Sequence, residues 1–471
     1  MEKRPLLIVF LSLFLSVLIL EIARLSGMYG ALLLSFFLML LVLLVLKKSY
    51  RIFLFIFLPF FLSFMILNTF KTDLKEVETS LVARVIHIRG NSFLVDRVKT
   101  QSGIGTWKKV NGRIRIVFDG DEYQKKNFVN IGTWIFAKGI LKKTRQYPFF
   151  TVYVNSSDIR SYGFAPYFDD FSTEVLYRLG RLRKNYEDFI RENSSNWDII
   201  SAVIFGTAPG YENKNLLLNS GIYHLFVVSG LHVNLLMYII YFLTGFISTN
   251  FRIRCLMSMT FITLYSLTIG YSFPAIRAML MINLILFFKL LDYPQDKFNV
   301  LGLCGILIFL LDPLSVLSAS FQMSFASTFI FMTIFDKKPE NLLESSKATF
   351  NASISLIPLT ILYFGNVYPL STILSSLLLP TTIIPMILGG IMGFIFQSVK
   401  LNFLSVIFIK GVEPFANFIK LLTQLLLKVP LVSLKVPENL RIALFYLTLS
   451  LAIFWLSSSR SIFLKQSGQI P

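Results

Sequence analysis

The chain has 471 residues, of which 55% are hydrophobic and only 15% are charged. A soluble globular protein does not reach this apolar fraction, so the composition predicts a protein that crosses a membrane several times. The formal net charge of +19 is expected in the loops and in a soluble insert, where it would suit anionic lipid headgroups or nucleic acid. The basic character of cytoplasmic loops in membrane proteins gives a similar surplus without any nucleic acid.

Three apolar segments open the chain, at residues 5–20, 28–46 and 52–67. No cleavage pattern follows the first of them, so we interpret it as a retained anchor and not as a signal peptide. Basic residues precede the first segment and separate the second from the third, which places the N-terminus in the cytoplasm. Three crossings then bring the chain outside the cytoplasm at about residue 71.

Residues 76–163 have a different texture, with short alternating segments separated by Gly, Asn and Asp turns. This pattern predicts β-strands. A five-stranded small barrel, the OB-fold, is the simplest arrangement for this length and strand count. The strands are expected at residues 84–88, 93–98, 113–118, 133–138 and 149–154.

Basic and aromatic residues are interleaved in the same insert. A basic groove can follow the phosphates of a single-stranded nucleic acid while aromatic faces stack on its bases. Alternatively, the lysines form a solvated face near anionic lipid and the aromatic residues fill the barrel. The side chains proposed to contact DNA are Lys108, Lys109, Arg113, Arg115, Lys142, Lys143, Trp107 and Trp134.

The rest of the chain is predicted to be helical. Apolar residues at spacings of three and four predict an amphipathic helix at 172–191, which is too charged to span and should lie on the membrane surface. Residues 199–205 are too short to cross and are expected to form a half-membrane or interfacial segment. Apolar runs fill residues 214–457, and several contain Pro or Gly breaks. Such breaks are tolerated at membrane depth when they are buried or line a cavity.

The stretch Gly221–Val233 carries His224, Ser229, Gly230 and His232 in this apolar region. Polar residues at membrane depth are by default candidates for a functional pathway. Small residues also let helices pack closely, and histidines can be satisfied packing residues. The residues alone leave both interpretations open.

Read as a motif, this stretch resembles the signature of the ComEC family of DNA-internalisation competence proteins, Gly-x-x-His-Leu followed by Ser-Gly-Leu-His-Val. Two further stretches resemble the family in the same order, Pro274–Ala278 and then Leu311–Pro313 leading to Ser320–Phe325. The resemblance implies an inner-membrane channel that conducts single-stranded DNA into the cytoplasm. It also implies a DNA-receptor complex outside, a separate nuclease and a cytoplasmic helicase or motor as partners.

The expected DNA pathway combines hydrogen-bond donors with a cation. Arg277 is the best-placed cation, and an unpaired guanidinium facing lipid would be costly. It should therefore face the conduit or pair with a carboxylate, for which Asp312 is the nearest candidate. The proposed pathway residues are His224, Ser229, Gly230, His232, Arg277, Asp312 and Gln322.

The sequence offers little for catalysis. It has no Gly-x-x-x-x-Gly-Lys loop to cradle phosphates. Ser229 and His232 lack a nucleophile elbow and a carboxylate partner, and two histidines without a third ligand make a weak metal site. Cys255 and Cys304 fit packing roles. Many ComEC-like proteins continue into a metallo-β-lactamase-like domain with clustered His and Asp ligands, whereas this sequence has only three histidines, so we expect a channel without nuclease activity, cofactor or metal. The alternative is an intramembrane enzyme or a small-solute transporter that uses the His/Ser centre.

These patterns predict a polytopic α-helical protein of the inner cell membrane with an inserted small all-β, OB-fold-like domain that lies outside the cytoplasm. The expected divisions are N-terminal membrane helices at 1–70, the barrel at 71–168, amphipathic and interfacial helices at 169–212, a competence-type channel domain at 213–460, and a tail at 461–471.

Overall fold

The computed structural model describes residues 5–25, 78–163, 171–334 and 350–441, together with 444 and 448; within these ranges it omits 90–91, 102–106, 111, 120–128, 145–147, 149, 156–158, 208, 227, 229, 352, 429–432. The segments expected at 28–46 and 52–67, most of the run that ends at 457, and the tail lie outside the described residues. The chain forms two compact units that do not follow its order. The first joins 1–87, 91–170 and 279–322, and the second joins 88–90, 171–278 and 323–471.

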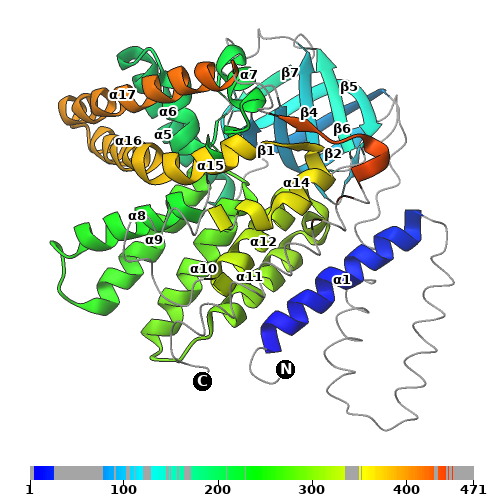
Figure 1. Ribbon diagram of the computed structural model, residues 1–471, viewed down its shortest axis with the longest axis horizontal. Helices are drawn as coiled ribbons and strands as arrows, with labels where there is room; N and C mark the ends of the chain where they lie inside the picture. Colours follow the sequence, from blue (N-terminus) through cyan, green and yellow to red (C-terminus); the bar gives the residue numbers. More distant parts are fainter. Residues whose placement is uncertain are drawn as a thin grey trace. The chain divides into compact units, whose positions relative to one another are not determined.

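Five strands of the first unit close into a small barrel (Figure 1). Their order is β1-β2-β4-β6-β5, and β5 pairs back with β1. The β4–β6 pair is parallel, whereas β2–β4, β5–β6 and β1–β5 are antiparallel. Fully buried apolar side chains from every strand fill the interior, as expected for alternating β-branched strands. The strands are β1 (Glu78–Arg89), β2 (Ser92–Gln101), β4 (Ile114–Asp119), β5 (Trp134–Lys143) and β6 (Phe150–Asn155).

All five barrel strands overlap the segments predicted from the sequence. Two further strands were not predicted, β3 (Lys108–Lys109) beside β2 and β7 (Ile159–Gly163) beside β5. The ten-residue β5 pairs with β7 through its first half and with β6 through its second half. This length lets one strand serve two partners along the same edge.

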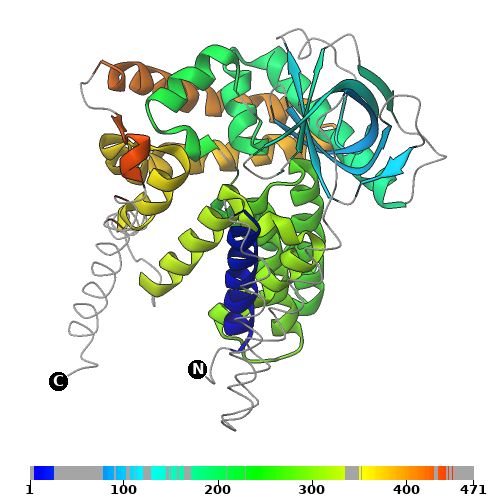
Figure 2. The same ribbon diagram turned by 90° about the vertical axis from the view of Figure 1, so that its right-hand side faces the viewer.

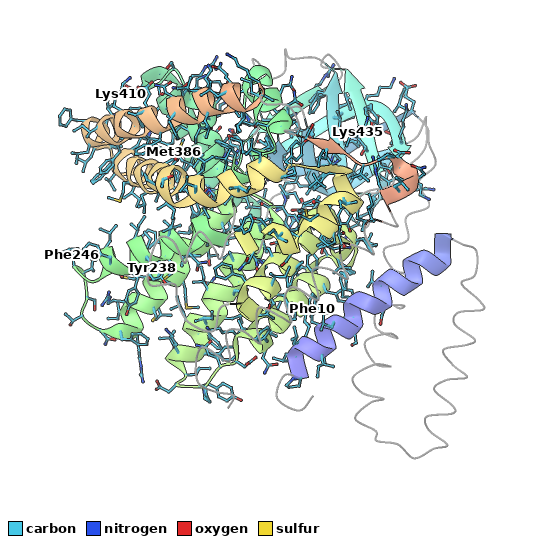
Figure 3. The ribbon with its side chains drawn as sticks, viewed as in Figure 1. Phe10, Tyr238, Phe246, Met386, Lys410 and Lys435 are labelled. Atoms are coloured by element: carbon cyan, nitrogen blue, oxygen red, sulfur yellow. The ribbon has the colours of Figure 1, made fainter. Side chains whose placement is uncertain are left out.

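Helix α1 (Pro5–Leu25) packs on α11 (Lys297–Leu311) in the same unit (Figure 1 and Figure 2). Two glycines of α11 make room for it. A Cβ on Gly302 would lie 2.5 Å from the backbone nitrogen of Leu7, and one on Gly305 would lie 2.3 Å from the Phe10 ring. Phe10, labelled in Figure 3, also meets the Phe321 ring at a centroid distance of 6.2 Å. Small residues at these positions therefore allow close helix packing.

The helices that carry the motifs begin and end near the expected breaks. They are α8 (Gly230–Thr244), α9 (Phe251–Ile269), α10 (Phe273–Leu290), the short 3-10 helix η5 (Pro313–Leu317) and α12 (Ala319–Ile334). Helix α8 packs against α9. Beyond the end of α8, Phe246 is 77% exposed, and Tyr238 on α8 itself is 57% exposed (Figure 3). Apolar side chains this exposed suit a lipid-facing helix pair.

The second unit is built around α5 (Phe171–Asn193) and α6 (Trp197–Phe205). The predicted amphipathic helix is confirmed as α5, although its place on a membrane surface stays a prediction. Residues Asp198–Phe205 of α6 are all buried, and α6 packs against α5 and α16. Helix α6 is thus covered by protein, and its expected place as a half-membrane or interfacial segment stays a prediction. A short apolar run predicts burial but does not tell lipid from protein as the apolar partner.

The long pair α16 (Ile384–Ser398) and α17 (Asn402–Leu426) packs side by side (Figure 1). Met386 on α16 and Lys410 on α17 mark the pair in Figure 3. The other elements of this unit are α7 (Tyr211–Asn219), η4 (Tyr223–Phe226), α14 (Ile357–Phe364), α15 (Pro369–Leu378), the π-helical turn η6 (Leu379–Ile383), and the two-residue strands β8 (Asn366–Val367) and β9 (Leu434–Lys435).

Two helices among the described residues are long and apolar enough to span a bilayer, Phe273–Leu290 and Thr381–Ser398. Shorter apolar helices occur at Pro5–Phe14, His232–Thr244 and Lys297–Leu311. The described part of the chain is thus helix-rich, with a small β-barrel and two candidate spans. The larger number of crossings expected from the sequence stays a prediction.

Candidate functional site

The three motifs that the sequence singled out lie at helix ends. Helix α8 begins at Gly230 of the first motif, and Pro274 of the second is the second residue of α10, where its missing N–H costs no helical bond. In the third motif, α11 ends at Leu311 and η5 begins at Pro313. The breaks predicted from Gly and Pro are therefore real boundaries.

The two histidines of the first motif have different surroundings. His224 on η4 is exposed, and its Nδ1 lies 3.0 Å from the carbonyl oxygen of Gly221. His232 on α8 is 1% exposed, and its imidazole ring forms a hydrogen bond with the backbone of Val203 in α6. Burial against α6 favours the packing interpretation of His232. Ser229 lies outside the described residues.

The loops around the first motif are closely packed. Gly206, which ends α6 at φ +70°, lies against Val228, and a Cβ on it would be 3.1 Å from the Val228 side chain. Gly221 has φ +77°, and a Cβ there would be 2.3 Å from the Tyr368 ring. A positive φ together with these contacts explains why glycine stands at both positions.

Gly230 brings the first two motifs into contact. A Cβ built on it would lie 3.0 Å from Nη2 of Arg277 and 3.8 Å from the Cβ of Ala278. Arg277 itself is 6% exposed. The start of α8 thus lies beside the buried guanidinium of α10, and a larger residue at Gly230 would displace it.

The third motif contacts the barrel. The Nη1 of Arg113, just before β4, donates to Oδ2 of Asp312, which follows α11. The two side chains are only 15% and 6% exposed. From the sequence, Arg277 is expected either to face the conduit or to pair with Asp312, and that expectation stays a prediction; the structure adds Arg113 as a partner of Asp312. Arg113 is thus paired and mostly buried, which leaves its side chain less available to DNA than the exposed cations of the barrel.

Gln322 serves the local structure of the third motif. Its side-chain amide donates to the carbonyl of Val316 in η5 at 3.1 Å. The Ser318 hydroxyl accepts from the backbone N–H of Phe321 at 3.1 Å and so caps the start of α12. These bonds fix the turn between η5 and α12.

An exposed face of the barrel gathers cationic and aromatic side chains on neighbouring strands. Arg115 on β4 and Lys142 on β5 are both opposite Thr151 of the intervening β6. Arg115 and Lys142 are exposed, and the Lys142 Nζ lies 5.5 Å from the centre of the Tyr153 ring. That ring is 46% exposed. We call Arg115, Lys142 and Tyr153 the cationic face.

The other predicted DNA contacts divide into exposed and buried residues. Lys108, Lys109 and Lys143 are exposed. Trp107 is 42% exposed and meets Phe136 edge-on, with the ring centroids 6.5 Å apart. Trp134 is only 4% exposed, so it cannot offer a face to a base and its predicted role was wrong. A sequence in which aromatic residues alternate with lysines does not show which of the aromatic side chains are buried in the folded barrel.

Sequence reasoning missed Arg183 of α5, which is 5% exposed. Its Nη1 donates to the carbonyls of Thr268 and Ile269 at 3.2 and 3.1 Å, and its Nε donates to Glu187 at 2.7 Å. The guanidinium also lies 5.4 Å from the centre of the Phe205 ring. Arg183 thus satisfies the last carbonyls of α9, where a cation is favoured by the helix dipole.

Tyr186, on the same helix as Arg183, also donates to a backbone carbonyl of another helix. Its side chain is fully buried. Its hydroxyl donates to the carbonyl of Gly390 at 2.9 Å. A Cβ on Gly393 would lie 2.3 Å from the same hydroxyl oxygen. Burial raises the pKa of the Tyr186 phenol, so the group stays protonated and donates. Three positions separate Arg183 from Tyr186, and this helical spacing is the signal that could have placed both on one buried face.

No group of three or more His, Cys, Asp or Glu side chains within the described ranges is placed to hold a metal ion. The candidate features are therefore buried polar contacts at helix ends, found in each unit, and the exposed cationic face of the barrel in the first unit. They belong to a helix-rich protein with candidate membrane spans and a small β-barrel.

Comparison with known proteins defines the family. The family model described as "Competence protein" matches residues 211–459, more than half of the chain. The chain therefore belongs to the competence protein family. It is similar to ComE operon protein 3 of Bacillus subtilis (strain 168), with 23% identity over 234 residues. That match spans 48% of this chain but only 30% of the relative. No solved structure matches the chain.

Proposed function

We propose that the chain is a multi-pass inner-membrane channel that conducts single-stranded DNA into the cytoplasm during natural transformation. The observation that carries this proposal is the cationic face of the barrel. Membership of the competence family supports it, because a protein of this family is expected to act on DNA during uptake. The barrel, which we take to be OB-fold-like and to lie outside the cytoplasm, would meet the strand first.

The cationic face suits a single strand for a physical reason. Arg115 on β4 and Lys142 on β5 present positive charge on the two strands that flank β6, and Tyr153 on β6 offers an aromatic ring. Backbone phosphates bind such cations regardless of sequence, and unpaired bases stack on exposed rings. A duplex keeps its bases stacked inside and would use only the charges.

The helix ends of the motifs support the passage through the membrane. A strand of phosphates in a low-dielectric region needs hydrogen-bond donors, water and positive charge. Broken helices at membrane depth line cavities or are buried in protein. Arg277 supplies a cation beside the break at Gly230, so we place the pathway along these helix ends.

The proposal also assigns partners. The sequence contains no phosphate-cradling nucleotide loop, so a cytoplasmic helicase or motor would supply the energy. A DNA-receptor complex would deliver DNA from outside, and a separate nuclease would degrade one strand. An enzyme or small-solute transporter built on a His/Ser centre is not favoured, because His224 and His232 bond to separate backbone groups.

Binding by the full-length protein tests the role of the barrel. The protein is placed in lipid nanodiscs, and the fluorescence anisotropy of a labelled oligonucleotide is followed as salt is raised. We expect tighter binding of single-stranded than of duplex DNA, and a log–log salt slope of about −0.7 for each phosphate neutralised. Binding that does not weaken with salt would contradict an electrostatic face.

A further inference from the structure

The Arg113–Asp312 ion pair joins two segments that are 199 residues apart in the sequence. Arg113 precedes β4 of the barrel, and Asp312 stands between α11 and η5 of the third motif. Both side chains are largely withdrawn from solvent. A buried charge that loses its partner is strongly destabilising, so such a pair holds its two segments in one arrangement.

We propose that Asp312 is a positioning residue that anchors the barrel to the end of α11 through Arg113. In this assignment the carboxylate of the Leu-Asp-Pro motif does not touch DNA. It determines where the cationic face stands. The anchor affects DNA uptake only if the barrel binds DNA, so the expected effect on uptake rests on the proposed function.

The backbone around Asp312 makes the carboxylate a fixed point. The Asp312 N–H donates to the carbonyl of Ile308 at 2.9 Å and closes α11, and the Asp312 carbonyl accepts from Ser315 at 3.0 Å and opens η5. Pro313 directly follows and restricts the backbone. Helix α11 is in turn packed on α1.

The position of Arg113 explains why it is the partner. Gly112, with φ +123°, turns the chain into β4 just before it. The last carbonyls of α11 give that helix end a partial negative charge, which favours a guanidinium there. Arg113 lies two residues before Arg115, on the same side of an extended chain. Holding Arg113 therefore fixes the end of the strand that carries part of the cationic face.

A second Arg–Asp pair provides a matched control inside the barrel. Arg84 of β1 bonds Asp96 of β2 through Nε to Oδ1 at 2.9 Å and Nη2 to Oδ2 at 2.7 Å. Arg84 is 6% exposed. Because both residues belong to the barrel, Arg84→Ala should damage the fold of the barrel. Loss of Arg113 or Asp312 should release an intact barrel.

The test measures a distance in the full-length protein in nanodiscs. Spin labels are attached at Lys138→Cys on β5 and Leu310→Cys on α11, which are both exposed, after the buried Cys255 and Cys304 are replaced by alanine. We expect one narrow distance distribution for this parent. Arg113→Asp and Asp312→Arg should each broaden it at least about twofold, because like charges then face each other. The double swap should restore the narrow distribution.

Protease resistance separates an undocked barrel from an unfolded one. The barrel should stay resistant in the Arg113→Asp and Asp312→Arg variants and become sensitive in Arg84→Ala. If a single charge reversal removes the protein from the membrane, recovery of its abundance in the double swap supports the anchor. Unbroadened distances in both single variants would overturn the proposal, as would a double swap that restores neither distance nor abundance.

DNA uptake by the same variants gives the functional readout. Each single reversal should lower uptake at least about tenfold, and the double swap should recover it. If the distances behave as expected but the parent takes up no DNA, the anchor stands and the proposed function fails. If the parent takes up DNA and the distances do not respond, the anchor fails alone.

Discussion

Gly230, the first residue of α8, lies against Arg277 of α10, close enough that an added Cβ would stand 3.0 Å from the guanidinium Nη2. This contact joins two motifs that the sequence could relate only by their order. It also means that the position of the buried cation depends on the absence of a side chain at residue 230.

Substitution of Gly230 should therefore act through Arg277. Gly230→Ala requires the guanidinium to move by a few tenths of an ångström, whereas Gly230→Val forces a larger shift. Overpacking of this kind costs about 1–3 kcal/mol. We expect DNA uptake to fall severalfold in the first variant and to be lost in the second, with membrane abundance largely kept.

The matched control is Gly411→Ala on α17, where an added Cβ meets nothing within 4 Å. Alanine within a helix is favoured over glycine by roughly 0.5–1 kcal/mol, so this variant should keep uptake and gain slight stability. Normal uptake by Gly230→Val would contradict the proposed role of the contact.

The two histidines of the first motif should differ in what they contribute to stability. His232→Ala removes a buried ring and leaves the Val203 backbone group without this hydrogen bond, which should cost about 1–3 kcal/mol of unfolding free energy. His224→Ala, at an exposed position, should stay within about 0.5 kcal/mol. Thermal unfolding of both variants in detergent measures the difference. Equal losses would argue against the packing role of His232.

The buried Arg183 side chain should contribute strongly to the stability of the second unit. Arg183→Gln removes charge-assisted bonds to two carbonyls at the end of α9, each bond of this kind contributing about 1.5–3 kcal/mol. Arg183→Lys keeps the charge but loses the planar fork, and should recover part of the stability. The exposed Arg181→Gln in the same helix is the control and should have little effect. Similar unfolding temperatures for Arg183→Gln and Arg181→Gln would contradict this account.

The cationic face predicts separate effects of charge and stacking on DNA binding. Arg115→Gln and Lys142→Gln should each make the log–log salt slope shallower by about 0.7. Tyr153→Ala should weaken binding by roughly 1–3 kcal/mol at any salt concentration. Anisotropy with the full-length protein in nanodiscs measures both quantities.

Lys138→Gln serves as the control for these variants, because the Lys138 ammonium already pairs with Glu78 at 3.0 Å. It should leave the slope nearly unchanged. A slope equal in all variants and the parent would show that DNA binds elsewhere on the protein.

Local patterns in the sequence were sufficient for the elements themselves. Alternation predicted the five barrel strands, and helical spacing predicted α5, because both depend on residues close together in the chain. Gly230, Pro274 and Asp312 marked real helix ends for the same reason. The two-residue β3 carries too few residues to show any period.

Contacts across the chain lay beyond such patterns. Nothing local connects Arg113 to Asp312, so no pattern in the sequence brings these two residues together. The burial of Trp134 and of Arg183 was not predicted, for a related reason. Burial of an aromatic or charged side chain depends on what the rest of the fold places over it, and the hydropathy of the residue alone does not report this.

Entry of DNA into living cells tests the central claim most directly. Cells that lack this gene, cells complemented with the native chain and cells complemented with Arg277→Ala receive labelled duplex DNA, and the labelled single strand in the cytoplasm is measured beside membrane abundance. We predict internalised single-stranded DNA only with the native chain, and loss of it in Arg277→Ala although the variant protein reaches the membrane. Internalisation by the deletion strain at the level of the complemented strain would contradict the proposed function.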